Sequence, residues 1–316
     1  MKSSALILTF VLFTATVFGG GYSHREYTQF SRKGADACKE TAKAVARACA
    51  TEARADYAIA LGKCANLADP EECKECKAEA SDQLKEALAE CKDQTDARLE
   101  ACSKLGPEPY DPVIDPANFG GPINNPYFPL VPGTTYIYEG ETESGLEHGE
   151  FAVTHNTRVI MGVTCVEVRD TVYVDGEMAE DTLDWFAQDS EGNVWYFGEN
   201  TYELEDGLIT TIDGSFIAGV NGDKPGIVMK AQPMIGDFYR QEFSLGNAED
   251  YAETIGLNES VTVPAGSFGN CLKSQETTPL EPDVLEHKFF APGVGNVLTI
   301  DVNTGDRVEL IEVITN

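Results

Sequence analysis

The sequence predicts an α+β protein in two domains: a disulfide-stapled antiparallel α-hairpin, then an all-β antiparallel meander that forms a barrel or half-barrel. Two observations carry this prediction. Seven of the nine cysteines lie between residues 38 and 102, in a stretch rich in the helix formers Ala, Lys and Glu. From Thr134 onward the apolar residues alternate with a period of two, which is typical of strands with one buried face.

Two segments precede the predicted hairpin. Residues 1–21 combine Lys2, an apolar run over 5–18 and a small-residue patch over 19–21, which is the pattern of a cleaved signal peptide. The run is too short to span a bilayer, and no later segment is long and apolar enough to do so. Residues 22–34 are polar and aperiodic, so we expect a flexible lead. An exported protein is predicted, in the periplasm, on the cell surface or outside the cell.

Residues 35–105 are predicted to form the helical hairpin, which turns at Pro70. Asp69 suits an N-cap, Pro70 suits the first helical position, and Gly106 suits the end of the second helix. The cysteines mirror one another about residue 70, which would place each mirrored pair at one height of the hairpin. We therefore expect three disulfides, which join Cys38 to Cys102, Cys49 to Cys91 and Cys64 to Cys76.

Mirror pairing leaves Cys73 over, in a C-x-x-C motif with Cys76. Cys73 could take Cys64 instead, and the remaining thiol would be free or would link two chains into a dimer. Flanking acids disfavour a redox-active thiol, Lys77 stands where haem attachment needs histidine, and a zinc site there lacks a fourth ligand. A structural disulfide is the favoured interpretation.

Residues 106–133 hold eight of the fifteen prolines and are predicted to be an extended linker, packed in part through its aromatic residues. Residues 134–316 are the predicted acidic β-domain. Its candidate strands cover 135–139, 150–156, 164–174, 178–187, 194–198, 238–243, 260–263, 271–277, 285–291, 296–302 and 307–313. Alternation places Cys165 and Cys271 on outer faces, where a fourth disulfide between neighbouring strands is plausible.

The net charge of −30 lies almost entirely in the second part of the chain. Residues 126–316 hold 8 Lys and Arg against 34 Asp and Glu, whereas residues 1–125 hold 15 against 19. This field disfavours nucleic acids and anionic lipid surfaces as partners and favours cationic ligands or divalent ions. An acidic surface that serves solubility or salt adaptation explains the same charge and is the favoured interpretation.

Four polar residues share otherwise apolar strand faces: His155, Asp170, Arg240 and His287. In a curled sheet they would meet in the lumen, with Arg240 paired to Asp170, and would orient a ligand. Separate structural roles at strand ends or in buried ion pairs are the commoner case and are favoured.

Asp283, Glu286 and His287, with Glu281, form the densest group of candidate metal ligands. Glu286 and His287 would point to opposite faces of one strand, so they would bind one divalent cation together only if the segment bends. The chain has no nucleophile elbow, no H-E-x-x-H and no phosphate loop. Apart from that divalent cation, no cofactor is expected.

Several stretches between residues 125 and 313 resemble a known family. They read NPYFPL at 125–130, DWFAQD at 184–189, GNVWY at 192–196, YRQE at 239–242, SVTVP at 260–264 and TPLEPDVLEHKFFAPGVG at 278–295. On these residues the β-domain resembles the uncharacterised secreted bacterial proteins of DUF3108-like type. The resemblance implies a curved antiparallel sheet, similar to that of periplasmic lipoprotein carriers, and no established activity. The cysteine hairpin departs from that family.

We therefore expect an exported, non-enzymatic binding or structural protein whose β-domain binds an apolar or cationic ligand or a cell-surface partner. The hairpin would be a rigid spacer or a dimerising arm. The alternative is a metal-dependent hydrolase that uses Asp283, Glu286 and His287.

Overall fold

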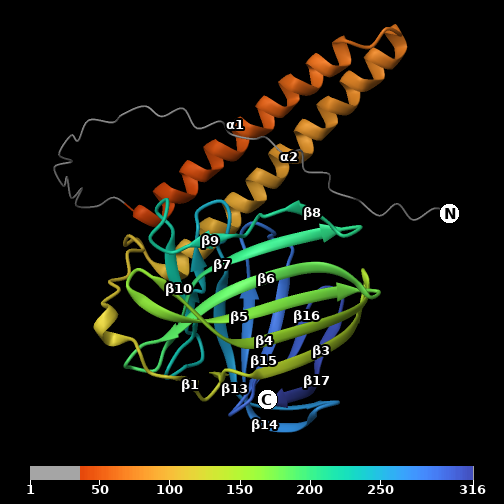
Figure 1. Ribbon diagram of the computed structural model, residues 1–316. Coiled ribbons are helices and arrows are strands. Elements are labelled where there is room, and N and C mark those ends of the chain that lie inside the picture. Colours follow the sequence, from red (N-terminus) through yellow and green to blue (C-terminus); the bar gives the residue numbers. More distant parts are fainter. Residues whose placement is uncertain (1–35, 316) are drawn as a thin grey trace. The chain divides into compact units, whose positions relative to one another are not determined.

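Two long helices and one large antiparallel sheet make up the computed structural model, which describes residues 36–315 (Figure 1). Helix α1 spans Ala37–Ala65 and helix α2 spans Pro70–Leu105. Neither helix combines the length and hydropathy that a membrane crossing requires. The predicted signal peptide, residues 1–21, and the predicted lead, residues 22–34, lie outside the described residues.

The helix ends follow from the local sequence, as predicted. Asp69 precedes α2, and its Oδ1 accepts the backbone N–H groups of Glu71 at 2.7 Å and Glu72 at 3.2 Å. Pro70 occupies the first turn, where its missing N–H costs nothing. Gly106 ends α2 with a φ of 88°, a left-handed conformation that glycine adopts without steric cost.

The three mirrored disulfides are confirmed. They join Cys38 to Cys102, Cys49 to Cys91 and Cys64 to Cys76, with Cα–Cα distances of 5.6, 5.8 and 5.5 Å. Apart from cysteines, the buried apolar residues of the hairpin are alanines, which remove little surface from water. Covalent links, each typically contributing about 2–4 kcal/mol, therefore supply stability that apolar burial does not.

A short 3₁₀ helix (Pro116–Asn118) and a two-stranded sheet, β1 (Ile123–Asn125) and β2 (Phe128–Leu130), follow the hairpin. The other fifteen strands share one sheet. They are β3 (Thr134–Thr142), β4 (Gly145–Ile160), β5 (Val163–Val174), β6 (Glu177–Gln188), β7 (Val194–Glu205), β8 (Leu208–Thr211), β9 (Phe216–Ile217), β10 (Lys224–Met229), β11 (Phe238–Arg240), β12 (Glu242–Phe243), β13 (Tyr251–Val263), β14 (Gly266–Thr277), β15 (Leu285–Ala291), β16 (Gly295–Asp301) and β17 (Arg307–Thr315).

The sheet is an open half-barrel whose two ends are consecutive in the chain. Its order is β11-β13-β14-β15-β16-β17-β3-β4-β5-β6-β7-β10-β12, with β8 and β9 paired to β7. The end strands β11 and β12 are separated by Gln241 alone. Beside this seam a Cβ on Gly226 would lie 2.2 Å from the Gln241 backbone, so only glycine permits the approach. In Figure 1 the curved strands β4–β7 lie across the interior from β14–β16.

Every predicted strand overlaps an observed one, and 285–291 coincides with β15. The predicted strand 238–243 is split at Gln241 into β11 and β12. Five strands were not predicted. Four of them, β1, β2, β8 and β9, have four residues or fewer. The fifth, β10, has Pro225 and Gly226 as its second and third residues, and both residue types are unusual within strands, so the strand pattern is hard to recognise.

The proline-rich segment packs against the sheet, as expected for its aromatic residues. Phe119 meets Phe197 edge to face at 5.6 Å between ring centroids on the outer side. Phe128, on β2, reaches the interior and contacts Phe151, Phe186 and Phe290. Strand β2 therefore joins the inner core of the half-barrel.

The expected disulfide between Cys165 and Cys271 is wrong. Both thiols are free and fully buried, and neither lies on an exposed face. Cys165 lies on β5 in the outer core cluster with Trp185 and Phe197, whereas Cys271 lies on β14 in the inner core cluster. The two side chains point to opposite faces of the sheet, on strands that are not neighbours, so the two sulfur atoms cannot meet.

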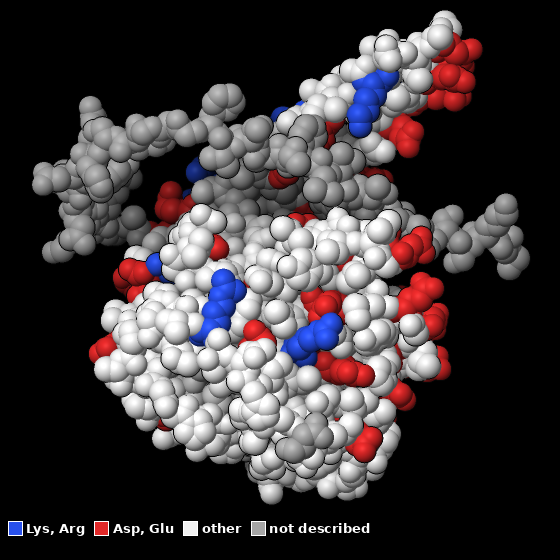
Figure 2. Space-filling model, in the orientation of Figure 1, with Lys and Arg blue, Asp and Glu red and all other residues white. Residues whose placement is uncertain are grey.

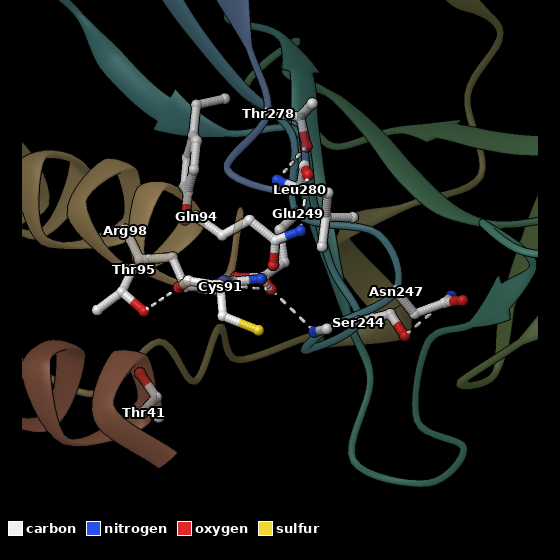
Figure 3. A network of polar contacts seen from close by, with 12 residues as sticks. Thr41, Cys91, Gln94, Thr95, Arg98, Ser244, Asn247, Glu249, Thr278 and Leu280 are labelled. Carbon is white, nitrogen blue, oxygen red and sulfur yellow. Dashed lines mark hydrogen bonds and ion pairs between the residues drawn. The ribbon is translucent and has the colours of Figure 1, made fainter. Parts of the chain in front are cut away.

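A buried ion pair attaches the hairpin to the sheet (Figure 3). Arg98 of α2 donates from Nη2 to Glu249 Oε1 at 2.8 Å and from Nε to both carboxylate oxygens at 3.1 and 3.2 Å, and both side chains are at most 3 % exposed. The N–H of Gly246 also donates to Glu249. Gln94 donates to the Leu280 carbonyl nearby at 2.9 Å.

Arg98→Met should destabilise the protein by about 3–5 kcal/mol, because it leaves the Glu249 carboxylate buried without its cation. The double variant Arg98→Met/Glu249→Met should recover part of that loss. Urea unfolding followed by circular dichroism measures both. Lys85→Ala, which breaks an exposed pair with Asp82, is the control and should cost at most about 1 kcal/mol. An Arg98→Met loss no larger than the control's would contradict the role of the buried pair.

Ellman's reagent should titrate three thiols in the unfolded, unreduced protein: Cys73, Cys165 and Cys271. In the folded protein Cys73 should react first, because it is half-buried while the other two have no exposed surface. Burial also raises the pKa of Cys165 to about 12, which suppresses its thiolate. Cys73→Ser should lower the count by one. A total of one thiol would mean that Cys165 and Cys271 are bonded after all.

Candidate functional site

The curved sheet encloses a cavity of about 670 Å³. Its walls come from β3–β6 on one side and β14–β17 on the other, and β2 contributes Phe128 to Leu130. Gln241, at the seam, also lines it. The volume falls within the range of about 300–1,000 Å³ that small-ligand sites usually have. The cavity is therefore the candidate functional site.

Aromatic side chains form the apolar part of the wall. Phe186 stacks on Tyr196 with ring centroids 4.8 Å apart, and Phe128 lies 5.5 Å from Phe186. Phe151 and Phe290 contact Phe128 from opposite walls. These rings meet because alternate residues of each strand point to the concave face of the sheet.

Acidic side chains make up most of the polar part of the lining. They are Glu143, Glu147, Asp170, Asp184, Glu276, Glu286, Asp301 and Asp306, and Lys288 is the single basic residue among the described residues that line the cavity. Figure 2 shows the same imbalance outside, where red acidic groups outnumber blue basic groups over the visible face of the sheet. The charge surplus read from the sequence therefore extends into the interior.

Lys288 is held by two of these carboxylates. Its Nζ lies 3.0 Å from Glu276 Oε2 and 3.3 Å from Glu286 Oε2. Burial alone would lower the pKa of Lys288, but the two carboxylate charges and the hydrogen bond that Lys288 donates to Glu276 outweigh it, so that the pKa is raised. The site thus already holds one alkylammonium group, which belongs to the protein.

Within residues 36–315, the carboxyl groups of Asp170, Asp184 and Glu147 on the other wall form no salt bridge, although the charge of Lys288 acts on Asp170 from a distance. Burial, together with the charge of Glu180, raises the pKa of Asp170 to about 7. Asp184 is 6 % exposed, and burial raises its pKa well above the usual value. The Tyr196 hydroxyl donates to Asp184 Oδ1. Burial also raises the pKa of Glu147, at the end of the wall near the β3–β4 turn.

Three further acids, which are not among the residues that line the cavity, also have raised pKa values. Burial raises the pKa of Glu199 to about 7 and that of Asp250 to about 6, and it raises the pKa of Glu242 well above the usual value. Each of these groups also feels the charge of another buried carboxyl. These carboxylates therefore repel one another when they are ionised, and bound protons or a bound cation would reduce that repulsion.

Two turns line the cavity at the end away from β2. The β3–β4 turn contributes Thr142 to Ser144, and the β16–β17 turn contributes Asp301, Thr304 and Asp306. The backbone N–H of Glu143 donates to Asp306 Oδ2 at 2.9 Å, which ties the two turns together. Carboxylates therefore line this end of the cavity as well.

Of the four polar residues expected in the lumen, the structure places Asp170 on the cavity wall and the other three elsewhere. Arg240 donates to the Tyr251 hydroxyl at 2.9 Å and lies against the Tyr110 and Phe243 rings, so its expected pair with Asp170 is not formed. It lies at the seam, beside the hairpin disulfide, where its Nη2 is 3.8 Å from Cys38 Sγ.

The two histidines also lie away from the cavity. His155 is exposed and lies between Val153 and Thr157, where the register of β4 against β5 shifts. Because of this shift, strict alternation along the strand does not predict which face His155 occupies. His287 lies between Glu286 and Lys288, which line the cavity, so it points to the opposite face of β15. Burial and the charge of Lys273 lower the pKa of His287.

The predicted metal ligands Asp283, Glu286 and His287 are not brought together. Glu286 lines the cavity and pairs with Lys288, His287 faces away, and Asp283 precedes the strand. Among residues 36–315, no three His, Cys, Asp or Glu side chains lie close enough to hold one metal ion. The bend that a shared site would have required does not occur, because β15 is regular here and pairs on both sides.

Sequence reasoning missed Lys288, Glu276 and the aromatic residue Phe128. Lys288 was detectable in principle, because Glu286, Lys288 and Phe290 alternate along one strand. Phe128 was not, since it enters the interior from a proline-rich segment that has no strand pattern of its own. Its position depends on contacts with strands far away in the sequence.

No family model and no curated protein matches the chain, so the resemblance to the DUF3108-like family stays a prediction. Among solved structures, a protein described as "a putative lipoprotein" from Parabacteroides distasonis ATCC 8503 is 16 % identical, with a TM-score of 0.34. The match covers 60 % of this chain and 98 % of the other. Likeness at this level defines neither a shared fold nor a shared function.

The ligand-free protein should become less stable as the pH rises from 5 to 8. Acids whose folded pKa is raised, such as Asp170 and Glu199 at about 7 and Asp250 at about 6, keep their protons in the folded state after the unfolded chain has lost them. Their contribution is complete below the unfolded pKa of about 4 and is lost as the pH rises through the folded pKa values.

Thermal unfolding at constant ionic strength, measured at several pH values, tests this expectation. Asp170→Asn removes one of the titrating groups and should make the dependence shallower. Asp181→Asn, on the outer face beside Arg169, is the matched control and should leave the slope nearly unchanged. A melting temperature that increases between pH 5 and pH 8 would show that the interior acids do not control the profile.

Proposed function

We propose that the chain is an exported, non-enzymatic binding protein whose cavity takes a small ligand with a hydrocarbon body and a positively charged amino group. The observation that carries the proposal is the pair Asp170 and Asp184 on an aromatic wall. Among residues 36–315, no Lys, Arg or His forms a salt bridge with either carboxyl group. Buried carboxylates are normally paired, so a cationic ligand fits this wall.

The electrostatics favour a cation over an anion or a neutral lipid. A ligand ammonium beside Asp170 would stabilise the ionised carboxylate and lower its raised pKa, as Glu276 and Glu286 stabilise Lys288 on the facing wall. A carboxylate or phosphate ligand would instead meet like charge. Ligand selection by sign of charge follows directly from this lining.

The aromatic rings supply the other half of the recognition. Phe128, Phe151 and Phe290 can contact a hydrocarbon body, and the faces of Tyr196 and Phe186 can receive an ammonium group through cation–π attraction. The protein uses this pairing elsewhere, since Lys104 lies 4.7 Å from the centroid of the Phe238 ring and Lys273 lies 5.2 Å from that of Phe289.

Export is supported by the three disulfides, which are typical of oxidising compartments, and by the predicted signal peptide. The alternative, a metal-dependent hydrolase, needed Asp283, Glu286 and His287 in one place. Because these side chains diverge, the geometry supports the binding protein better.

Octylamine should bind the purified protein at pH 8, in isothermal titration calorimetry, more tightly than octanoate or octanol. Asp170→Asn should weaken octylamine binding about tenfold, since a hydrogen bond between charged groups contributes about 1.5–3 kcal/mol. For the wild type, affinity should rise from pH 6 to pH 8 as Asp170 ionises around its pKa of about 7, while the amine stays protonated.

Asp181→Asn is the matched control, because it makes the same chemical change on the outer face of β6. It should leave octylamine affinity unchanged. Equal binding of octylamine and octanoate, or equal affinities for the Asp170→Asn and wild-type proteins, would refute a cation site at this wall.

A further inference from the structure

The carboxyl groups of Asp184, Asp170 and Glu147 line the cavity. They stand in a line with Glu180, which lies on the same face of the sheet but is not among the residues that line the cavity. Glu180, Thr182 and Asp184 alternate on β6 and share its inner face. The strand register places Asp184 opposite Val168 of β5 and places Glu180 opposite Val172. On the other side of β5, Glu147 of β4 lies opposite Val174.

Asp170 of β5 completes this line. The four carboxyl groups stand at the levels of residues 168, 170, 172 and 174 of β5, in the order Asp184, Asp170, Glu180 and Glu147. Two residues of strand span about 7 Å, so the line presents one carboxyl group for every step of about 7 Å along the wall. It extends over about 20 Å from the deepest group to the one nearest the turns.

This spacing does not suit a compact ion. Among residues 36–315, no three acidic, His or Cys side chains converge on one point, so a single metal ion would neutralise only part of the line. Lys288 on the facing wall acts on Asp170 only through its charge and forms its salt bridges with Glu276 and Glu286. Arg169, the base nearest in sequence, pairs with Asp181 on the outer face.

We infer that the ligand of this cavity is a linear aliphatic polyamine, whose successive ammonium groups pair with Asp184, Asp170, Glu180 and Glu147. This inference rests on the proposed function and narrows its ligand class. The short methylene segments between the nitrogens of a polyamine would lie along Phe151, Phe186 and Tyr138, which line the cavity beside these carboxyl groups. A monoamine can satisfy only one step of the line, so affinity increases with the number of spaced charges.

Isothermal titration calorimetry of the full protein at pH 8 tests the inference with three probes: octylamine, 1,8-diaminooctane and spermine. The first two have the same carbon chain and differ by one ammonium group. We expect the diamine to bind at least tenfold more tightly than the monoamine, and spermine more tightly again. Raising the salt concentration should weaken spermine most, since it makes the most ionic contacts.

Variants at the two ends of the line locate the contacts. Asp184→Asn/Glu147→Gln should weaken spermine at least tenfold and remove most of the diamine's advantage over octylamine. Amides match these carboxyls in shape and remove charges that are costly to bury, so the variants should fold, which thermal unfolding checks. Glu180→Gln provides a second, single-site variant with the same expectation for spermine. Asp181→Asn on the outer face is the control and should change nothing.

The outcomes separate the two proposals. If octylamine and 1,8-diaminooctane bind with equal affinity, or if the amide variants leave spermine affinity unchanged, the polyamine inference is overturned and the monoamine site remains. Failure of all three amines to bind overturns both. Tight binding of spermine that Asp181→Asn weakens as much as Glu180→Gln would show attraction to the acidic surface and would also overturn the inference.

Discussion

The seam at Gln241 is the constraint on which the rest of the structure depends. A long antiparallel sheet twists and curls, but its ends need not meet. Here the end strands β11 and β12 are consecutive in the chain and separated by one residue, so the sheet must bend until its ends lie together. The interior cavity follows from that curvature, and Gly226 allows the backbones at the seam to approach closely.

The curvature of the sheet also explains why so many acidic side chains can lie in the interior. A tightly packed core would not hold Asp170, Asp184 and Glu147, because their burial costs free energy that no salt bridge within residues 36–315 offsets. The half-barrel leaves open space instead, lined by rings on one part and by carboxyl groups on another. Such a lining is poorly suited to maximal stability and well suited to a cationic ligand, which is the usual compromise at a binding site.

The helical hairpin contacts the sheet near the seam, and none of its residues line the cavity. Its root meets the sheet through Arg98 and Glu249, beside the Cys38–Cys102 disulfide and the Arg240 side chain, which belongs to β11. Arg240 and Gln241 are neighbours in the chain, yet the first faces the hairpin and the second lines the cavity. The disulfides therefore stiffen a hairpin that is attached beside the seam, where the two ends of the sheet lie together.

Local sequence patterns were enough to predict much of the secondary structure and the disulfides of this protein. Asp69, Pro70 and Gly106 determine the ends of the second helix, the mirrored cysteine numbers determine three disulfides, and alternation determines most strands, because each depends on residues that are close in sequence or fixed by one turn. The sequence left open whether the sheet forms a full barrel or a half-barrel, and tertiary structure alone decided this and the grouping of Asp170 with Asp184, Lys288 and Phe128. Those contacts join strands far apart in the chain, and bulges such as the one beside His155 change which face a residue occupies. The same reason accounts for two of the wrong predictions: Cys165 and Cys271 lie in different core clusters on strands that are not neighbours, and Arg240 lies at the seam, away from Asp170.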